Sequence, residues 1–100
     1  MTIAEDPEGN ETSILHEMVD FKDLEVLEIG CGEGRLTWRY AEKAAHVTAI
    51  DPIAEDIATA RANLPDHLKG HVSFVRSNIG DFASSVIEKR FDIGLFAWSL

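Results

Sequence analysis

From residue 24 onward the chain alternates between short apolar segments and longer amphipathic segments, and this alternation limits its fold more than any other feature. Short runs rich in β-branched and aromatic residues predict strands at residues 24–29, 47–50, 72–76 and 91–97. Segments with a helical spacing of apolar residues predict helices between them, at residues 35–45, 52–64 and 81–89. Such alternation is typical of the α/β class, in which a parallel sheet has helices on both faces.

The predicted helices carry recognisable start and stop signals. Pro52 stands in the first turn of the second helix, acidic residues follow it at the positive end, and Pro65 ends the helix. Asp81 is a suitable N-cap for the third helix. The apolar rows expected to face the sheet are Leu36, Tyr40, Ala41 and Ala44 in the first helix, and Ile53, Ile57, Ala60 and Leu64 in the second.

The first residues differ in character from the rest of the chain. Residues 1–11 are acidic and contain Pro7 and Gly9, which predicts a flexible tail, and an apolar stripe predicts a short helix over residues 12–19. We therefore expect one domain over residues 12–100. The tail lacks the basic residues of a targeting segment, and no run approaches the about 20 apolar residues of a membrane helix.

Composition narrows the function classes. With 18 acidic against 9 basic residues, direct nucleic-acid binding by this segment is disfavoured. Cys31 is the only cysteine, so no internal disulfide can form, and a cytoplasmic location fits best. His67 and His71 have helical spacing, but Pro65 and Gly70 oppose a helix there and no set of ligands surrounds them. We expect no metal site.

The topology predicts where a ligand binds. Right-handed crossovers bring the carboxyl ends of parallel strands to one edge of the sheet. Ligands of open α/β sheets bind outside that edge, where the strand order reverses. The chemistry is therefore expected at residues 28–34, 51–52, 77–79 and 97–99.

The glycine-rich loop after the first predicted strand is either a tight turn or a ligand-binding loop. A dinucleotide fingerprint that starts at Gly30 needs its third glycine at position 35, which is Arg35 here. Glu28 and Glu33 would also repel a pyrophosphate, whereas an acidic surround suits a cofactor with a sulfonium and an ammonium group. The sequence of this loop therefore disfavours NAD as the ligand.

Two polar residues follow the next predicted strands, and each has two interpretations. Asp51 can accept hydrogen bonds from the two hydroxyl groups of a ribose, or it can cap the helix that starts at Pro52. Asn78 can accept from an adenine amino group while the next backbone N–H donates to a ring nitrogen, or it is an ordinary turn residue.

Taken together, the four strand ends resemble the class I S-adenosylmethionine-dependent methyltransferase family, through the runs V-L-E-I-G-C-G-E-G (26–34), V-T-A-I-D-P (47–52), F-V-R-S-N-I (74–79) and F-D-I-G-L-F-A-W-S-L (91–100). The resemblance implies a Rossmann-like sheet, S-adenosylmethionine as cofactor, and methyl transfer to an acceptor that these residues do not identify. It places the methionine part at Glu28 and at the loop with Gly30, Cys31, Gly32 and Gly34, the ribose at Asp51 beside Pro52, the adenine at Asn78 and Ile79, and the methionine amino group near the backbone of Ala97.

The chain departs from the family pattern in length and at one position. The family often has Asp where Asn78 stands, and Asn accepts with less charge. The predicted strands are the first four of a seven-stranded fold, so we expect a truncated domain in which Ile93, Leu95 and Phe96 lie on an uncovered edge that promotes self-association. Cys31 is not expected to act as a nucleophile, because Glu28 and Glu33 raise its pKa.

Three function classes follow from these features. The first is a methyltransferase, with a small-molecule acceptor favoured and no membrane partner; the catalytic residues are not identified, and the fragment alone is expected to be inactive. The second is a non-catalytic binding or scaffold module that keeps the cofactor fold. A nucleotide-dependent oxidoreductase is disfavoured by Arg35 and the acidic loop.

Overall fold

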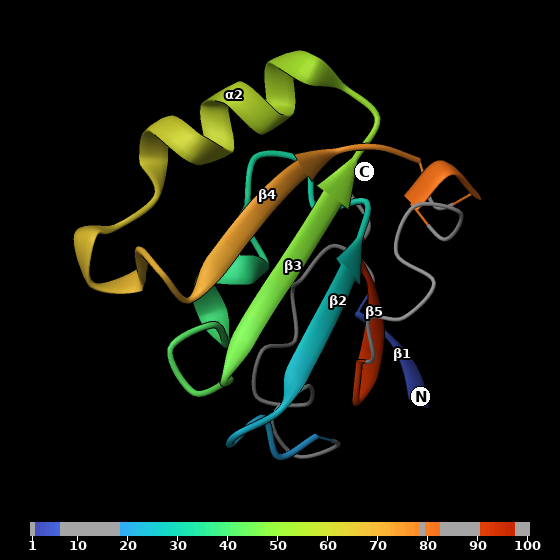
Figure 1. Cartoon of the computed structure of the whole chain (residues 1–100), viewed down its shortest axis with the longest axis vertical. Helices are drawn as coiled ribbons and strands as arrows, with labels where there is room; N and C mark the ends of the chain where they lie inside the picture. The colour runs from blue at the N-terminus through green and yellow to red at the C-terminus, as the bar shows by residue number, and fades with distance from the viewer. Residues whose placement is uncertain (1, 7–18, 79, 83–90, 98–100) are drawn as a thin grey trace.

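The computed structural model describes residues 2–6, 19–78, 80–82 and 91–97. Its strands form one parallel sheet in the order β1-β5-β2-β3-β4 (Figure 1). The elements are β1 (Thr2–Asp6), β2 (Glu25–Ile29), the short 3-10 helix η2 (Thr37–Arg39), β3 (His46–Asp51), α2 (Ala54–Asn63), the 3-10 helix η3 (Asp66–Leu68), β4 (Val72–Arg76) and β5 (Ile93–Ala97). The predicted α/β class with a parallel sheet is confirmed.

The predicted strands are found close to their expected bounds. β4 has the bounds that its pattern predicts, β2 starts one residue later, β3 is longer by one residue at each end, and β5 starts at Ile93 rather than at Phe91. Both faces of the sheet are covered. Phe82 and Phe91 pack with Leu27 and Ile50 on one face. The other face carries the larger core, which includes residues of β2–β5, of the 35–45 segment and of α2.

The structure corrects the prediction that residues 1–11 are a flexible tail. Residues 2–6 form β1, which pairs in parallel with β5 from Thr2 opposite Ile93 to Asp6 opposite Ala97. The predicted uncovered edge of β5 is therefore wrong, because a strand with unpaired N–H and C=O groups gains hydrogen bonds by taking up another segment of the chain. The rest of the predicted tail and the predicted helix up to residue 18 lie outside the described residues.

The helix predicted over residues 35–45 is replaced by η2 and a series of turns. The backbone here bonds mainly to the third preceding residue, as in Tyr40 N–H to Thr37 O at 3.3 Å, rather than to the fourth. Thr37, Trp38 and Tyr40 are poor helix formers, and the hydroxyls of Thr37 and Tyr40 bond to a residue of β2. The apolar row nevertheless faces the core as predicted, with Leu36, Tyr40, Ala41 and Ala44 buried.

α2 differs from its prediction at its start. Its N-cap is Ile53, so Pro52 precedes the helix instead of lying in its first turn. Ile57 and Ala60 are buried as expected, but the side chain of Ile53 is 53% exposed. Position 53 therefore belongs to the entry of the helix and not to its core-facing row.

The third predicted helix begins where expected but is capped by another residue. Residues 80–82 are helical, and the remainder of the predicted segment lies outside the described residues. The backbone N–H of Asp81 donates to Oδ1 of Asn78 at 2.8 Å, so Asn78 supplies the cap and Asp81 follows three residues later. The prediction of Asp81 as N-cap is wrong. Within the described part of the chain, no helix has the length and apolar character needed to cross a membrane.

Candidate functional site

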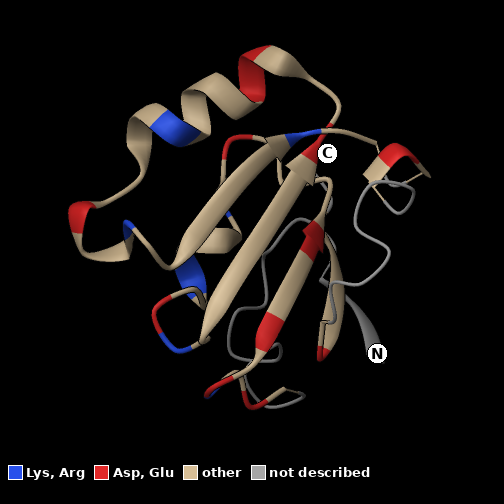
Figure 2. Ribbon diagram, viewed as in Figure 1, with Lys and Arg blue, Asp and Glu red and all other residues tan. Residues whose placement is uncertain are grey.

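The carboxyl ends of β2, β3, β4 and β5 meet at one edge of the sheet, at the upper end of the view in Figure 1. Glu28 lies near the end of β2, Asp51 ends β3, and Arg76 ends β4. Figure 2 shows Asp and Glu at this end of the strands and at the opposite end as well. The sheet thus brings together the segments on which the sequence places its ligand-binding residues.

The loop from Gly30 to Gly34 turns back over the end of β2 and requires glycine at two positions for different reasons. Gly30 has φ +76°, and a Cβ there would lie 3.0 Å from the carbonyl oxygen of Ala97. Gly34 has φ +92°, and a Cβ there would lie 2.6 Å from the Trp38 ring. Both backbone conformations favour glycine. The close approach also shows that the end of β5 borders the loop, as the sequence predicts for Ala97.

Glu28 lies beneath this loop with its side chain fully buried. Its Oε1 accepts hydrogen bonds from the Thr37 hydroxyl at 2.9 Å and from the Tyr40 hydroxyl at 2.5 Å. Its Oε2 is buried and has no partner among the described residues. Burial raises the pKa of Glu28 to about 7, although the bonds from Tyr40 and Thr37 oppose the rise. A buried carboxylate oxygen without a partner is a site for a donor or a cation.

Asp51 ends β3 and connects two segments through its carboxylate, which is 7% exposed. Oδ2 accepts from the backbone N–H of Gly32 at 3.0 Å, and Oδ1 accepts from that of Ile53 at 2.9 Å. The capping interpretation is therefore wrong, because the N-cap of α2 is Ile53 and no side chain caps the helix, whereas Asp51 closes a turn just before it. Each oxygen keeps a second acceptor position, so the ribose interpretation stays a prediction.

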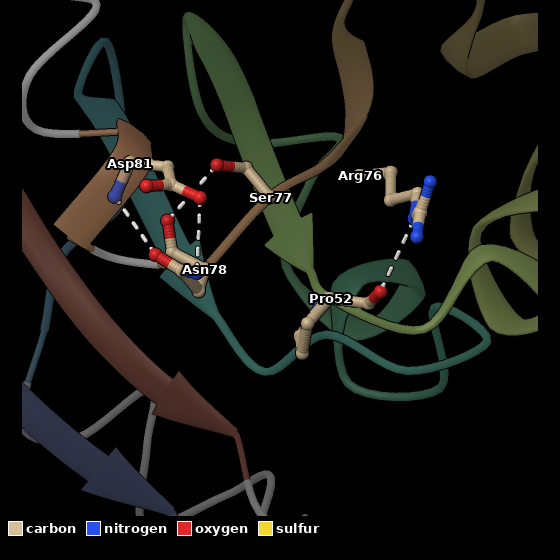
Figure 3. Close-up of a pocket in the computed structure, with 5 residues that line it drawn as sticks. All are labelled: Pro52, Arg76, Ser77, Asn78 and Asp81. Atoms are coloured by element: carbon tan, nitrogen blue, oxygen red, sulfur yellow. Dashed lines mark hydrogen bonds between the residues drawn. The ribbon is translucent and has the colours of Figure 1, made fainter.

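A cavity of about 450 Å³ opens at the ends of β3 and β4, lined by Pro52, Arg76, Ser77, Asn78 and Asp81 (Figure 3). A second cavity of about 350 Å³ is lined by Gly32, Glu33, Arg35 and Asp56. Asp51 stands between the two, since it precedes Pro52 in the chain and bonds to Gly32. A ligand that extends along this edge would meet the loop, then Asp51, then the β4 end.

Cys31 is buried in the loop and carries no reactive thiolate. Burial, followed by the charges of Glu28 and Asp51, raises the pKa of its thiol well above the ordinary range. The prediction that Glu28 raises the pKa of Cys31 is confirmed. The second charge that raises this pKa is that of Asp51, whereas the sequence predicts Glu33. Among the described residues, no three His, Cys, Asp or Glu side chains are grouped as a metal site requires.

Most predicted site residues come together at this edge, but several of their neighbours escaped prediction. Ile79 lies outside the described residues. The sequence predicts Thr37 and Tyr40 only as helix residues, because no local pattern links them to Glu28. It predicts Asp81 as a cap, although the spacing Asn-x-x-Asp resembles a capping box and signals that Asn78 and Asp81 interact.

Known proteins resemble the chain over most of its described part. Residues 20–97 match the family described as a methyltransferase domain. The ubiquinone biosynthesis O-methyltransferase of Schizosaccharomyces pombe is 32% identical over 84 residues, which cover 82% of this chain and 30% of that protein. The magnesium-protoporphyrin O-methyltransferase of Rhodobacter capsulatus is 35% identical over 68 residues, 68% of this chain and 29% of that protein.

Solved structures share the fold. The glycopeptide N-methyltransferase MtfA, crystallised with sinefungin, superposes with a TM-score of 0.71 at 25% identity, over 93% of this chain and 37% of that one. The chain therefore spans about a third or less of the curated relatives that it matches. The residues that match the family, 20–97, include the strand ends and loops that form the sheet edge.

Proposed function

The chain belongs to the class I S-adenosylmethionine-dependent methyltransferase family, and we propose that its sheet edge binds S-adenosylmethionine for methyl transfer by the whole protein. One observation carries the proposal: the glycine loop is held between two buried carboxyl groups, Glu28, whose Oε2 has no partner among the described residues, and Asp51, which bonds to Gly32. Such carboxyl groups suit a cofactor with two cationic groups and disfavour a pyrophosphate.

The residues present fit this cofactor. The buried Oε2 of Glu28 needs a donor or a cation, and an ammonium group supplies both. A cation at that position would stabilise the carboxylate form of Glu28 and lower its pKa from about 7. Asp51 has acceptor positions left for the hydroxyls of a ribose, and the cavity beyond Pro52 has room for a base.

The contribution of these residues to transfer is binding and orientation. When bound, the cofactor supplies an electrophilic methyl group on a sulfonium. The loop from Gly30 to Gly34 brings backbone close to the ligand, which a side chain at Gly30 would prevent by contact with Ala97. Asp51 holds the loop through Gly32 and the α2 entry through Ile53, so both sides of the ligand site are positioned by one carboxylate. Such positioning favours direct transfer by proximity.

We propose a small molecule as methyl acceptor. The curated relatives described above are O-methyltransferases of ubiquinone biosynthesis and of magnesium-protoporphyrin. A net charge of −9 also disfavours a nucleic acid as partner of this segment. A cytoplasmic location is part of the same proposal, supported by the single cysteine. Cell fractionation with a tagged protein tests the location, and recovery in a membrane or organelle fraction would contradict it.

Isothermal titration calorimetry on the purified chain tests the cofactor. We expect S-adenosylmethionine and S-adenosylhomocysteine to bind and NAD not to bind. Binding of NAD without any response to the two sulfur-containing ligands would overturn the proposal in favour of an oxidoreductase. Binding of the cofactor by the whole protein, without transfer to any member of a small-molecule panel, would favour the scaffold alternative.

A further inference from the structure

Two hydroxyl groups donate to the same oxygen of the Glu28 carboxyl group. The Thr37 hydroxyl lies 2.9 Å from Oε1 and the Tyr40 hydroxyl 2.5 Å from it, and all three residues are buried. A carboxyl oxygen has two acceptor positions, and both positions of Oε1 are therefore used. When Glu28 is protonated, its proton lies on Oε2, the oxygen that has no partner among the described residues.

The winding of the chain after the glycine loop brings the two hydroxyls to one atom. Thr37 and Tyr40 are three residues apart, and the Tyr40 N–H donates to the carbonyl oxygen of Thr37 at 3.3 Å. Side chains three residues apart eclipse each other in a 3-10 turn, so both project in the same direction. The Tyr40 ring also stacks on Phe21, with ring centroids 4.6 Å apart. Local winding and packing therefore fix the positions of both donors.

The neighbours of Glu28 across the sheet are apolar. β3 places Ala49 opposite Glu28, and β5 places Leu95 opposite it. The titratable groups around it come from the other elements packed here: Tyr40 in the 35–45 segment, Cys31 in the loop, Asp51 at the end of β3, and Asp56 of α2, whose charge reaches Cys31. Glu33 and Arg35 line the cavity at the rim of the loop.

Glu28 is the group among the three buried partners that can exchange a proton near neutral pH. Burial raises its pKa to about 7, whereas the bonds from Tyr40 and then Thr37 lower it. Burial, followed by the charge of Glu28, raises the pKa of Tyr40 and of the Cys31 thiol, so both stay neutral. The effect on Cys31 also shows that the charge of Glu28 acts on the loop.

Resting on the proposed function, we infer that Thr37 and Tyr40 are positioning residues that confine the proton of Glu28 to Oε2, and that this proton passes to solvent when the ligand's ammonium group binds at the glycine loop. A positive charge within about 4–6 Å favours the ionised form of a carboxyl group. The two hydroxyl donors stabilise the carboxylate that remains. Because coupling between two binding events is reciprocal, loss of the proton strengthens binding of the cation, and affinity rises with pH.

Isothermal titration calorimetry with S-adenosylhomocysteine, in pairs of buffers that differ in ionisation enthalpy, counts the protons released. From the pKa of about 7, we expect about one proton per ligand at pH 6 and about a tenth of one at pH 8. The affinity should rise by up to about tenfold per pH unit below pH 7. The matched ligand is 5′-methylthioadenosine, which has the nucleoside but no amino-acid part, and its binding should release no proton.

Variants that lack one hydroxyl test the positioning role. Tyr40→Phe keeps the ring that stacks on Phe21 but removes a donor, so Glu28 should hold its proton to a higher pH and release several-fold more of it at pH 8 than wild type. Thr37→Val should act in the same direction with a smaller shift. The matched control is Thr48→Val, which removes a buried hydroxyl without a partner in the described part of the chain and should leave the pH profile unchanged.

The outcomes separate this inference from the function on which it rests. Binding of S-adenosylhomocysteine at pH 6 without proton release would overturn the inference and leave the proposed cofactor standing. Unshifted pH profiles in Tyr40→Phe and Thr37→Val, with affinity lowered equally at every pH, would reduce both hydroxyls to a packing role. Failure of the wild type to bind the ligand at any pH would overturn the proposed function, and this inference with it. Unfolding midpoints identify the variants that remain folded, and the wild-type measurement needs no variant.

Discussion

The two ends of the candidate site use the same functional groups in opposite surroundings. At the β2 end, the carboxylate of Glu28 is fully buried and its pKa is raised to about 7. At the β4 end, Asn78 and Asp81 are exposed, and their hydrogen bonds are short-range ones within a single turn. Because Glu28 is buried, its protonation changes the free energy of unfolding, which therefore depends on pH. Because Asp81 is exposed, its charge contributes little to that free energy. Four predictions test this contrast.

The largest effect is expected at the loop. Gly34→Ala places a Cβ 2.6 Å from the Trp38 ring at φ +92°, and Trp38 is itself packed edge-on against Phe74 with ring centroids 5.6 Å apart. We expect the free energy of unfolding to fall by about 2–4 kcal/mol, from backbone strain and overpacking together. Urea denaturation measures it.

Gly70→Ala is the matched control for that substitution. Gly70 has the same φ of +92°, but a Cβ there would meet nothing within 4 Å. Only the conformational cost of about 1–2 kcal/mol remains. Equal losses in the two variants would show that contact with Trp38 is not what constrains the loop.

The next effect is the pH dependence that Glu28 gives to folding. The folded-state pKa of about 7 lies above the ordinary glutamate value of 4.5, so the folded state holds the proton that the unfolded chain has already released. This stabilisation is complete below about pH 4.5 and is lost as the pH rises through 7. The free energy of unfolding changes by about 3 kcal/mol over this pH range. Glu28→Gln should remove this component, so denaturant unfolding at pH 5 and pH 8 should differ less than in wild type. Identical pH profiles would place Glu28 in a more hydrated environment.

Substitution of Asp51 tests the middle of the site, between the β2 end and the β4 end. Asp51→Ala should weaken S-adenosylhomocysteine binding by about 1.5–3 kcal/mol, since a carboxylate that accepts hydroxyl hydrogen bonds is removed. Folding should weaken by about 1–3 kcal/mol, because the N–H groups of Gly32 and Ile53 lose their acceptor. Calorimetry and denaturant midpoints measure the two losses on the same preparation. A shifted midpoint with unchanged affinity would restrict Asp51 to its structural role.

The smallest effect is expected at the exposed end. Asn78→Ala removes the acceptor of the Asp81 N–H and should lower the free energy of unfolding by about 1 kcal/mol, with no pH-dependent component near neutrality. Chemical denaturation at pH 5 and pH 8 checks both parts. A loss comparable to that of Gly34→Ala would mean that the two ends of the site are equally coupled to the core.

Local patterns determined the sheet and the positions of its loops. β4 spans the predicted residues 72–76, and β2, β3 and β5 lie within two residues of their predicted bounds at each end. A strand is recognised from its own apolar residues and from the Gly, Pro or Asp that ends it, and the parallel topology then brings the strand ends to one edge. For this reason the loop with Gly30, Asp51, Asn78 and Ala97 could be placed together from sequence.

Only the tertiary structure decided the contacts between segments. The 35–45 segment has helical apolar spacing, yet Thr37 and Tyr40 bond to Glu28 and the backbone winds as a tighter turn. β1 forms from an acidic segment because β5 offers a free edge far along the chain. Periodicity shows which residues face the core, but it does not show which buried oxygen a hydroxyl will meet or which strand will pair with an edge. Those choices depend on atoms distant in sequence, whose positions are set when the chain folds.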